Sequence, residues 1–233
     1  MRLAGVENGR FADQLAVLTD ADWSRPTDCV RWDVHAVVSH VIGAAASQVS
    51  PREFLRQVRK GRPVRREIGA PYWWDGMNEV QVRERAGRGP QQLIDEWSTL
   101  SIDSVVARTR LPRPIAALPL LTLPPPVGWQ PVAYLFDIGF TRDVWAHRID
   151  VAVATGHAFQ ATTDHDGRIL ADLVAEWAGS HGQPFDLVLE GAGGGEFTAG
   201  TGGEAVRLDT IEFVRTLAGR RPGTGVLAHP LPL

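Results

Sequence analysis

The segment "TRDVWAHRID" constrains the fold more than any other, because it places charged side chains on a helix face that has to be buried. In a helix, positions three and four apart are neighbours, so Asp143, His147 and Asp150 lie along one stripe. Phe136 and Phe140 precede them on the same stripe, and a helix face that carries two phenylalanines normally turns inward. The chain must therefore fold so that a helix-packed interior provides partners for two carboxylates and an imidazole.

The first two thirds of the chain show the apolar periodicity of helices. Phe11, Leu15 and Leu18 form one apolar stripe. Asp33 is a suitable N-cap for a second helix. A later inward stripe consists of Leu93, Trp97 and Leu100. The expected helices after the first stripe are residues 34–49, 51–67, 73–87, 90–109 and 132–154, the last ending before Gly156. Grouped into four helical regions, they predict a four-helix bundle.

The connection before the last of these helices, residues 111–131, is rich in proline and shows no helical period until its end. A structureless stretch of this length is unusual in a compact domain and is often functional, for example as the rim of a site.

The pattern changes after about residue 157. We expect a helix at 166–179, strands at 185–191, 195–200 and 204–209, and an amphipathic helix at 210–220 that Asp209 or Thr210 caps. Strands mixed with flanking helices indicate a small α+β domain. The predicted fold class is therefore α+β with two domains, a helical bundle over residues 1–156 and a small α+β domain over 157–233.

The overall composition excludes several classes of protein. The 233 residues carry a net charge of −3 with a pI of about 6.2, so nothing points to a nucleic-acid or membrane partner. A single cysteine, Cys29, rules out an intrachain disulfide framework and fits a reducing compartment. No signal peptide and no apolar run of about 18 residues is evident. We expect a cytoplasmic protein.

Asp143 and His147 have the spacing that lets two side chains on one helix reach the same metal ion. Catalytic zinc sites use three protein ligands and keep a fourth position open. The third ligand must come from another helix, and His40 is the best candidate, because its neighbours Ala36 and Ala44 are small and apolar. Bundles build metal sites in this way, from carboxylates and histidines on facing helices.

Other interpretations of the same residues stay open on spacing alone. Asp143 could cap a loop or pair with Arg142 or Arg148, and His147 could be a hydrogen-bonded core histidine. Asp150 could pair with an arginine, or it could orient a histidine ligand from behind.

Two segments carry a resemblance to a known family. "PTDCVRWDVHAVVSHVIG" and "RDVWAHRIDVAVATG" resemble the second- and fourth-helix signatures of the DinB-like, mycothiol-dependent maleylpyruvate isomerase family. "MNEVQVRERAG" is similar to a helix between them, and "EAVRLDTIEFVRTLAGR" resembles the family's sterol-carrier-like second domain. The resemblance implies a divalent metal, usually zinc with nickel as an alternative, held by His40, Asp143 and His147. It also implies that Arg220, or the adjacent Arg221, contacts a thiol cofactor or supports catalysis.

The function that this resemblance implies is thiol chemistry. A metal-activated mycothiol would add to a small electrophile, in an S-transferase or a maleylpyruvate isomerase-like enzyme that is a monomer or a homodimer. Two rival functions share the same histidines: a non-catalytic protein that binds a ligand or partner, and a zinc hydrolase that uses no thiol.

Three further features receive a simpler interpretation. We interpret Cys29 as structural, because no base is identifiable near it in the sequence. The basic cluster Arg52, Arg56, Arg59, Lys60, Arg62, Arg65 and Arg66 fits a solvated helix face, with an anionic-substrate site as the alternative. The glycine-rich "EGAGGGEFTAGTGG" fits no phosphate-binding motif and predicts hairpin connections.

Overall fold

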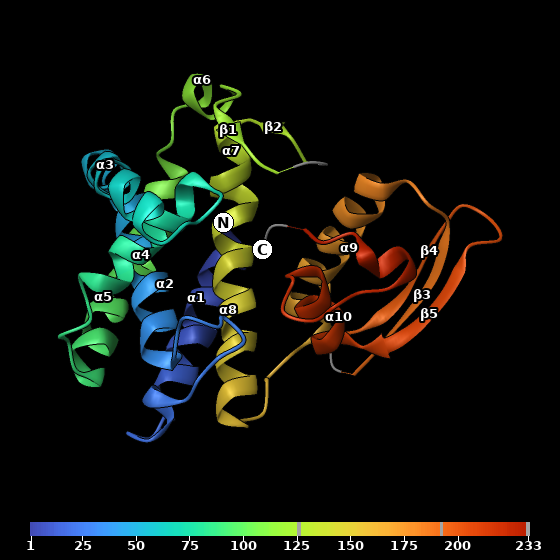
Figure 1. Ribbon diagram of the computed structural model, residues 1–233, viewed down its shortest axis with the longest axis horizontal. Coiled ribbons are helices and arrows are strands. Elements are labelled where there is room, and N and C mark those ends of the chain that lie inside the picture. Colours follow the sequence, from blue (N-terminus) through green and yellow to red (C-terminus); the bar gives the residue numbers. More distant parts are fainter. Residues whose placement is uncertain (125–126, 192, 232–233) are drawn as a thin grey trace. The chain divides into compact units, whose positions relative to one another are not determined.

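The structure, a computed structural model, describes residues 1–124, 127–191 and 193–231. The chain forms two compact units (Figure 1): Met1–Leu118 with Ala133–His157, and Pro119–Val132 with Ala158–Leu233. The mixture of helices and small sheets confirms the predicted α+β class. The predicted domain limits and the sterol-carrier-like character of the second domain stay predictions. No described helix is both long and apolar enough to cross a membrane.

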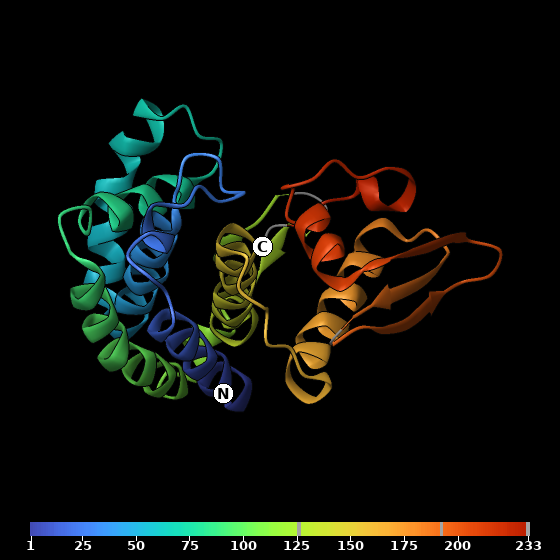
Figure 2. The same cartoon turned by 90° about the horizontal axis from the view of Figure 1, so that it is seen from below.

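Helices make up nearly all of the first unit (Figure 2). Its long helices are α1 (Arg2–Ala16), α2 (Val34–Val49), α3 (Pro51–Glu67), α4 (Trp73–Arg83), α5 (Pro90–Thr109) and α8 (Phe140–Thr155). Both α1 and α2 pack against α5 and against α8, while α3 and α4 form a hairpin that packs on α2. These contacts are those that a bundle of α1, α2, α5 and α8 requires, and the four-helix bundle itself stays a prediction.

The core of the first unit follows the predicted stripes. Phe11 and Trp97 meet edge to face with ring centroids 5.1 Å apart, and Leu15 and Leu93 are buried beside them. Leu18 and Leu100, predicted on the same stripes, are only partly buried against this core. Burial of such large apolar side chains, at about 1.5–3 kcal/mol each, holds α1 and α5 against each other.

The segment 132–154 is not the single α-helix that periodicity predicts. It begins as α7 (Val132–Tyr134), continues as a π-helix over Leu135–Gly139 and becomes α8 only at Phe140. A π-helical turn accommodates an extra residue, so the α-helical register does not extend from Phe136 to Asp143. The rings of Phe136 and Phe140 still meet, with centroids 5.4 Å apart. As predicted, α8 ends at Gly156, whose φ is 74°.

The proline-rich connection is more ordered than the sequence predicts. It contains α6 (Arg113–Ala116) and two short antiparallel strands, β1 (Leu121–Thr122) and β2 (Trp129–Gln130), and residues 125–126 lie outside the described part. Local turns and a two-residue pairing leave no periodicity, which explains why the sequence pattern misses them.

The second unit holds a three-stranded sheet in the order β4-β3-β5. β3 (Phe185–Glu190) pairs antiparallel with β4 (Gly195–Ala199) and parallel with β5 (Glu204–Asp209). Phe185, Leu187 and Leu189 alternate onto the buried face, which α9 (Arg168–His181) and α10 (Thr210–Leu217) cover (Figure 1). The predicted strands are confirmed, and Asp209 caps α10 by accepting hydrogen bonds from the backbone of Ile211 and Glu212.

Candidate metal centre

His40 lies in the middle of α2, with its side chain in the interior of the first unit. The helix begins where predicted, because the carboxylate of Asp33 accepts a hydrogen bond from the backbone N–H of Ala36 at 2.8 Å. His40 is buried, as are Ala36 and Ala44 beside it. The indole of Trp32 lies with its centroid 5.1 Å from that of the His40 ring. These contacts hold the imidazole in one position and exclude water from one of its faces.

Asp143 and His147 lie one turn apart on α8 and face His40. The Oδ1 atom of Asp143 is 3.3 Å from Nε2 of His40 and 3.6 Å from Nε2 of His147. The two imidazole rings meet edge to face with centroids 4.9 Å apart. The structure therefore brings together the three residues predicted from the sequence, and their nearest ligand atoms all lie within 4.8 Å of one another.

These separations fit the donor set of a small divalent cation. Two atoms bound to one zinc ion at about 2.0–2.1 Å in a tetrahedral arrangement lie about 3.3–3.4 Å apart. The His40–Asp143 separation of 3.3 Å has that value, and the His147–Asp143 separation of 3.6 Å is slightly longer. The side chain of Asp143 is 25% exposed, whereas those of both histidines are nearly buried. The cluster is thus accessible on the Asp143 side, where a fourth ligand could enter.

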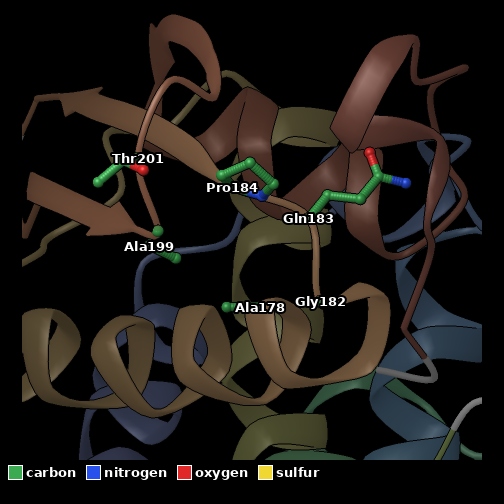
Figure 3. Close-up of a pocket in the computed structure, with 7 residues that line it drawn as sticks. Ala178, Gly182, Gln183, Pro184, Ala199 and Thr201 are labelled. Atoms are coloured by element: carbon green, nitrogen blue, oxygen red, sulfur yellow. The ribbon is translucent and has the colours of Figure 1, made fainter.

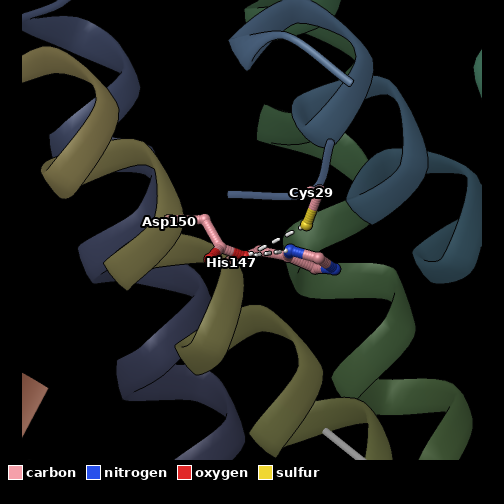
Figure 4. A group of neighbouring side chains, drawn as sticks. All are labelled: Cys29, His147 and Asp150. Atoms are coloured by element: carbon pink, nitrogen blue, oxygen red, sulfur yellow. Dashed lines mark hydrogen bonds and ion pairs between the residues drawn. The ribbon is translucent and has the colours of Figure 1, made fainter. Parts of the chain in front are cut away.

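Asp150 contacts the Nδ1 side of His147 (Figure 4). Its Oδ2 atom is 2.9 Å from Nδ1 of His147 and 3.5 Å from the thiol sulfur of Cys29, which comes from the segment before α2. A buried carboxylate accepts hydrogen bonds, so Nδ1 of His147 carries the proton and Nε2 presents its lone pair to Asp143. The contact with His147 fits the orienting role that the sequence leaves open for Asp150.

Cys29, His147 and Asp150 also have ligand atoms within 4.8 Å of one another. In this second group, however, Nδ1 of His147 and the Cys29 thiol are both directed at one carboxylate oxygen. The Asp150 contact therefore supports His147 as a ligand through Nε2. Sequence reasoning linked Cys29 to no base, because the two side chains come from segments far apart in the chain.

Sequence reasoning also missed Gln81 and Arg108. Oε1 of Gln81, on α4, is 2.8 Å from Nδ1 of His40. Arg108, on α5, is 4% exposed and donates to Oε1 of Gln48 at 2.6 Å and to Oγ1 of Thr141 at 2.7 Å. Burial lowers the pKa of Arg108 to about 10, against the opposing effect of Asp143. The spacing of residues within α4 or α5 does not point to Gln81 or Arg108, because their contacts are with side chains of other helices.

Arg220 and Arg221 belong to the second unit, after the end of α10. Nη1 of Arg220 donates to the carbonyl oxygen of Ala218 at 3.3 Å, and Nε of Arg221 lies 3.9 Å from Oε2 of Glu212. The role that the resemblance implies for Arg220 stays a prediction.

The basic cluster on α3 is partly neutralised within the α3–α4 hairpin. Arg56 forms ion pairs of 2.6 Å with Glu53 and with Glu84, and Lys60 pairs with Glu84 at 2.8 Å. The hydrogen bond from Arg56 lowers the pKa of Glu84 to about 2. These pairs favour the solvated helix face over the anionic-substrate site.

A cavity of about 290 Å³ lies within the second unit (Figure 3). Its lining residues are small or polar: Ala178, Gly182, Gln183, Pro184, Ala199, Gly200 and Thr201. None of them titrates near neutral pH, so this cavity offers a surface for contact and no group for acid–base or metal chemistry.

With the site described, comparison with known proteins places the chain in a family. Residues 5–152 match the family of the mycothiol maleylpyruvate isomerase N-terminal domain, which confirms the resemblance: the chain belongs to this family. Two crystal structures are similar, those of the mycothiol-dependent maleylpyruvate isomerase and of a histidine-to-alanine mutant of it. In each case the identity is 19%, the match covers 94% of this chain and 88% of the other, and the TM-score is 0.59. At this identity the similarity shows the fold. No curated protein matches the chain.

Proposed function

We propose that this chain is a divalent-metal-dependent enzyme that uses a low-molecular-weight thiol, mycothiol, on a small electrophilic substrate, as an S-transferase or an isomerase. The observation that carries the proposal is the convergence of His40, Asp143 and His147 from α2 and α8 in a chain of this family. The relatives of known structure are named as mycothiol-dependent isomerases, which supports the choice of thiol.

The three side chains would hold zinc, with nickel as the alternative, through two imidazole nitrogens and one carboxylate oxygen. When bound, the metal supplies a Lewis acid that lowers the pKa of a thiol and so provides a thiolate near neutral pH. With two neutral imidazoles and one carboxylate as ligands, a site loaded with a divalent ion would keep a net positive charge, which would favour an anionic sulfur. The exposed side of Asp143 gives access to the site.

The chemistry open to a thiolate in this position depends on the electrophile. With an activated alkene, the sulfur forms a carbon–sulfur bond and the alkene electron pair moves to the activating group. Rotation about the former double bond and loss of the thiol complete an isomerisation, and the thiol is regenerated. With an epoxide or a substrate that has a leaving group, the carbon–sulfur bond persists and the reaction is a transfer.

Turnover assays with and without thiol test this proposal. Purified zinc-loaded protein should convert maleylpyruvate, or one of a panel of activated alkenes and epoxides, only when mycothiol is present. His147→Ala should lower this turnover by at least about 100-fold, since a metal contributes several kcal/mol of charge stabilisation. Turnover that needs zinc and no thiol would instead favour a hydrolase, and zinc binding without turnover in any assay would favour the non-catalytic binding protein.

A further inference from the structure

Two buried glutamines lie on the Nδ1 side of the His40 ring, away from Asp143. Gln81 on α4 contacts the imidazole, and Gln57 on α3 contacts Gln81. Both glutamines are fully buried. A side-chain amide can present either its oxygen or its nitrogen to a neighbour, so the direction of each hydrogen bond has to be established from groups that can only donate or only accept.

The contacts of Gln57, the glutamine further from His40, fix the direction of these hydrogen bonds. The amide nitrogen of Gln57 lies 3.1 Å from the carbonyl oxygen of Gly43 and 2.8 Å from Oε1 of Glu53. A carbonyl oxygen can only accept, and Glu53 is a carboxylate because a hydrogen bond from Arg56 lowers its pKa. Two acceptors therefore bind the two protons of the Gln57 amide nitrogen, and its oxygen is left to face Gln81.

The hydrogen bonds of Gln81 are fixed in turn by the orientation of Gln57. Because Oε1 of Gln57 must accept, Gln81 donates to it through Nε2 at 2.7 Å. Gln81 then turns its own oxygen to His40, 2.8 Å from Nδ1. That oxygen can only accept, so the neutral imidazole carries its proton on Nδ1. Its Nε2 lone pair is left facing Asp143, at 3.3 Å from Oδ1.

The helix packing brings Gln81 close enough for this contact. Gly43 lies on α2 next to His40, and a Cβ atom at this position would overlap Cβ and Cγ of Gln81. Only glycine therefore allows α4 to approach α2 this closely. The α3–α4 hairpin thus places the Gln81 amide against Nδ1 of His40, which belongs to α2, and the Gln57 amide against Gln81.

We propose that Gln81 and Gln57 are positioning residues that keep His40 in the Nδ1–H tautomer and so keep Nε2 available to bind a metal ion. The opposite tautomer would donate from Nε2 to Asp143 and would occupy the ligand position. The metal-binding part of this inference rests on the proposed function. The tautomer part does not, because it concerns the protein without metal.

The test uses the whole 233-residue chain and two measurements. Nitrogen-15 NMR of histidine-labelled, metal-free protein, recorded at alkaline pH where imidazoles are neutral, identifies the His40 tautomer. Competition with a chelator measures the dissociation constant for zinc. Gln81→Met removes the acceptor at nearly constant volume, and Gln81→Glu keeps an acceptor oxygen, now of a carboxylate, in the same place although it cannot donate to Gln57. Gln14→Met, on α1, is the control for loss of a glutamine whose amide donates elsewhere, to the carbonyl oxygen of Arg148.

We expect wild-type His40 to be Nδ1–H and Gln81→Met to shift it toward Nε2–H, with a 10–100-fold weaker zinc affinity. Gln81→Glu and Gln14→Met should keep the wild-type tautomer. If Gln81→Met does not fold, Gln57→Met replaces it, because it frees the Gln81 amide to rotate and should give a mixture of tautomers. An unchanged tautomer in the folded Gln81 or Gln57 variant would overturn the inference. Failure of the wild type to bind zinc, with the tautomer shift intact, would refute the proposed function and leave the positioning role standing.

Discussion

At the scale of single residues, the site is defined by the hydrogen bond that each imidazole makes through Nδ1, the ring nitrogen that does not face Asp143. Asp150 holds Nδ1 of His147 and Gln81 holds Nδ1 of His40. Both rings therefore direct Nε2 at Asp143. When both Nε2 atoms are unprotonated, three lone pairs face one point, and a cation bound between them would relieve their repulsion, as the proposed function requires.

Asp150→Asn tests the support of His147. An asparagine amide can rotate and donate to Nδ1, which would move the histidine proton to Nε2 and block the ligand atom. We predict that zinc affinity falls about 10–100-fold, as measured by chelator competition. Asp103→Asn, which changes an exposed carboxylate on α5, should leave the affinity unchanged. Equal affinities in wild type and Asp150→Asn would show that Asp150 does not orient the ligand.

The residues of the site differ in how far the sequence predicts them. Asp143 and His147 are candidates because one helix carries both at a spacing of four, and His40 because its helix face is small and apolar, but only the family resemblance selects them as a ligand set. Gln81 and Gln57 are not, because a neutral polar residue gives no periodic signal and their contacts join three different helices. The spacing of residues in the sequence predicts which side chains share a face of one helix. It does not predict contacts between side chains of different helices, such as those of Gln81 and Gln57.

At the scale of elements, the α3–α4 hairpin is held together by close backbone contact and by ion pairs. A Cβ atom at Gly76 would overlap the carbonyl oxygen of Gly61 on the opposite helix. At the other end, Glu84, the residue that follows α4, accepts hydrogen bonds from Arg56 and Lys60 on α3. The hairpin thus presents Gln57 and Gln81 from a rigid support.

Gly76→Ala should destabilise the protein, although alanine is normally better than glycine inside a helix. The added methyl group overlaps backbone, which can only be relieved by separating the helices, at a cost of about 1–3 kcal/mol. Gly9→Ala, in α1, has open space around it and should stabilise the protein by about 0.5–1 kcal/mol. Urea unfolding measures both. A stabilising Gly76→Ala would mean that α3 and α4 do not approach this closely.

The ion pairs of the hairpin predict an acid-sensitive contribution to stability. The hydrogen bond from Arg56 lowers the pKa of Glu84 to about 2, below the ordinary value of 4.5 for a glutamate side chain. A carboxyl group whose pKa is lower in the folded state stabilises the fold above the unfolded-state value, and this contribution is lost as the pH falls from about 4.5 to about 2. Glu84→Gln should therefore be less stable than wild type at pH 7, with the difference shrinking toward pH 2. A difference that stays constant from pH 7 to pH 2 would contradict this assignment.

At the scale of the whole molecule, the α+β class followed from the change of periodicity near residue 157. The strand β3 was predictable, because its apolar residues alternate onto the buried face of the sheet. The strands β4 and β5 were predictable as short runs that follow glycine-rich connections. The π-helical turn at Leu135–Gly139 and the pairing of β1 with β2 were not, because each involves few residues and leaves no repeat. The grouping of residues 119–132 with the second unit likewise depends on contacts distant in sequence.

The second unit enters the proposed function through Arg220. If its guanidinium binds the thiol cosubstrate, Arg220→Ala loses a charge-assisted hydrogen bond worth about 1.5–3 kcal/mol, and thiol-dependent turnover falls roughly 10–100-fold. Zinc content should not change, because none of the three proposed ligands is altered. Arg221→Ala, one position further on, is the matched control. A larger loss in Arg221→Ala than in Arg220→Ala would transfer the role to Arg221.

The metal content of the purified protein tests the central claim most directly. Protein prepared without a nickel column and supplied with zinc should retain close to one ion per chain after removal of unbound metal. His40→Ala and His147→Ala should each lose it while remaining folded by circular dichroism. A wild-type protein that retains no divalent metal, or a His147→Ala variant that retains as much as wild type, would show that His40, Asp143 and His147 form a hydrogen-bonded core cluster and not a metal centre.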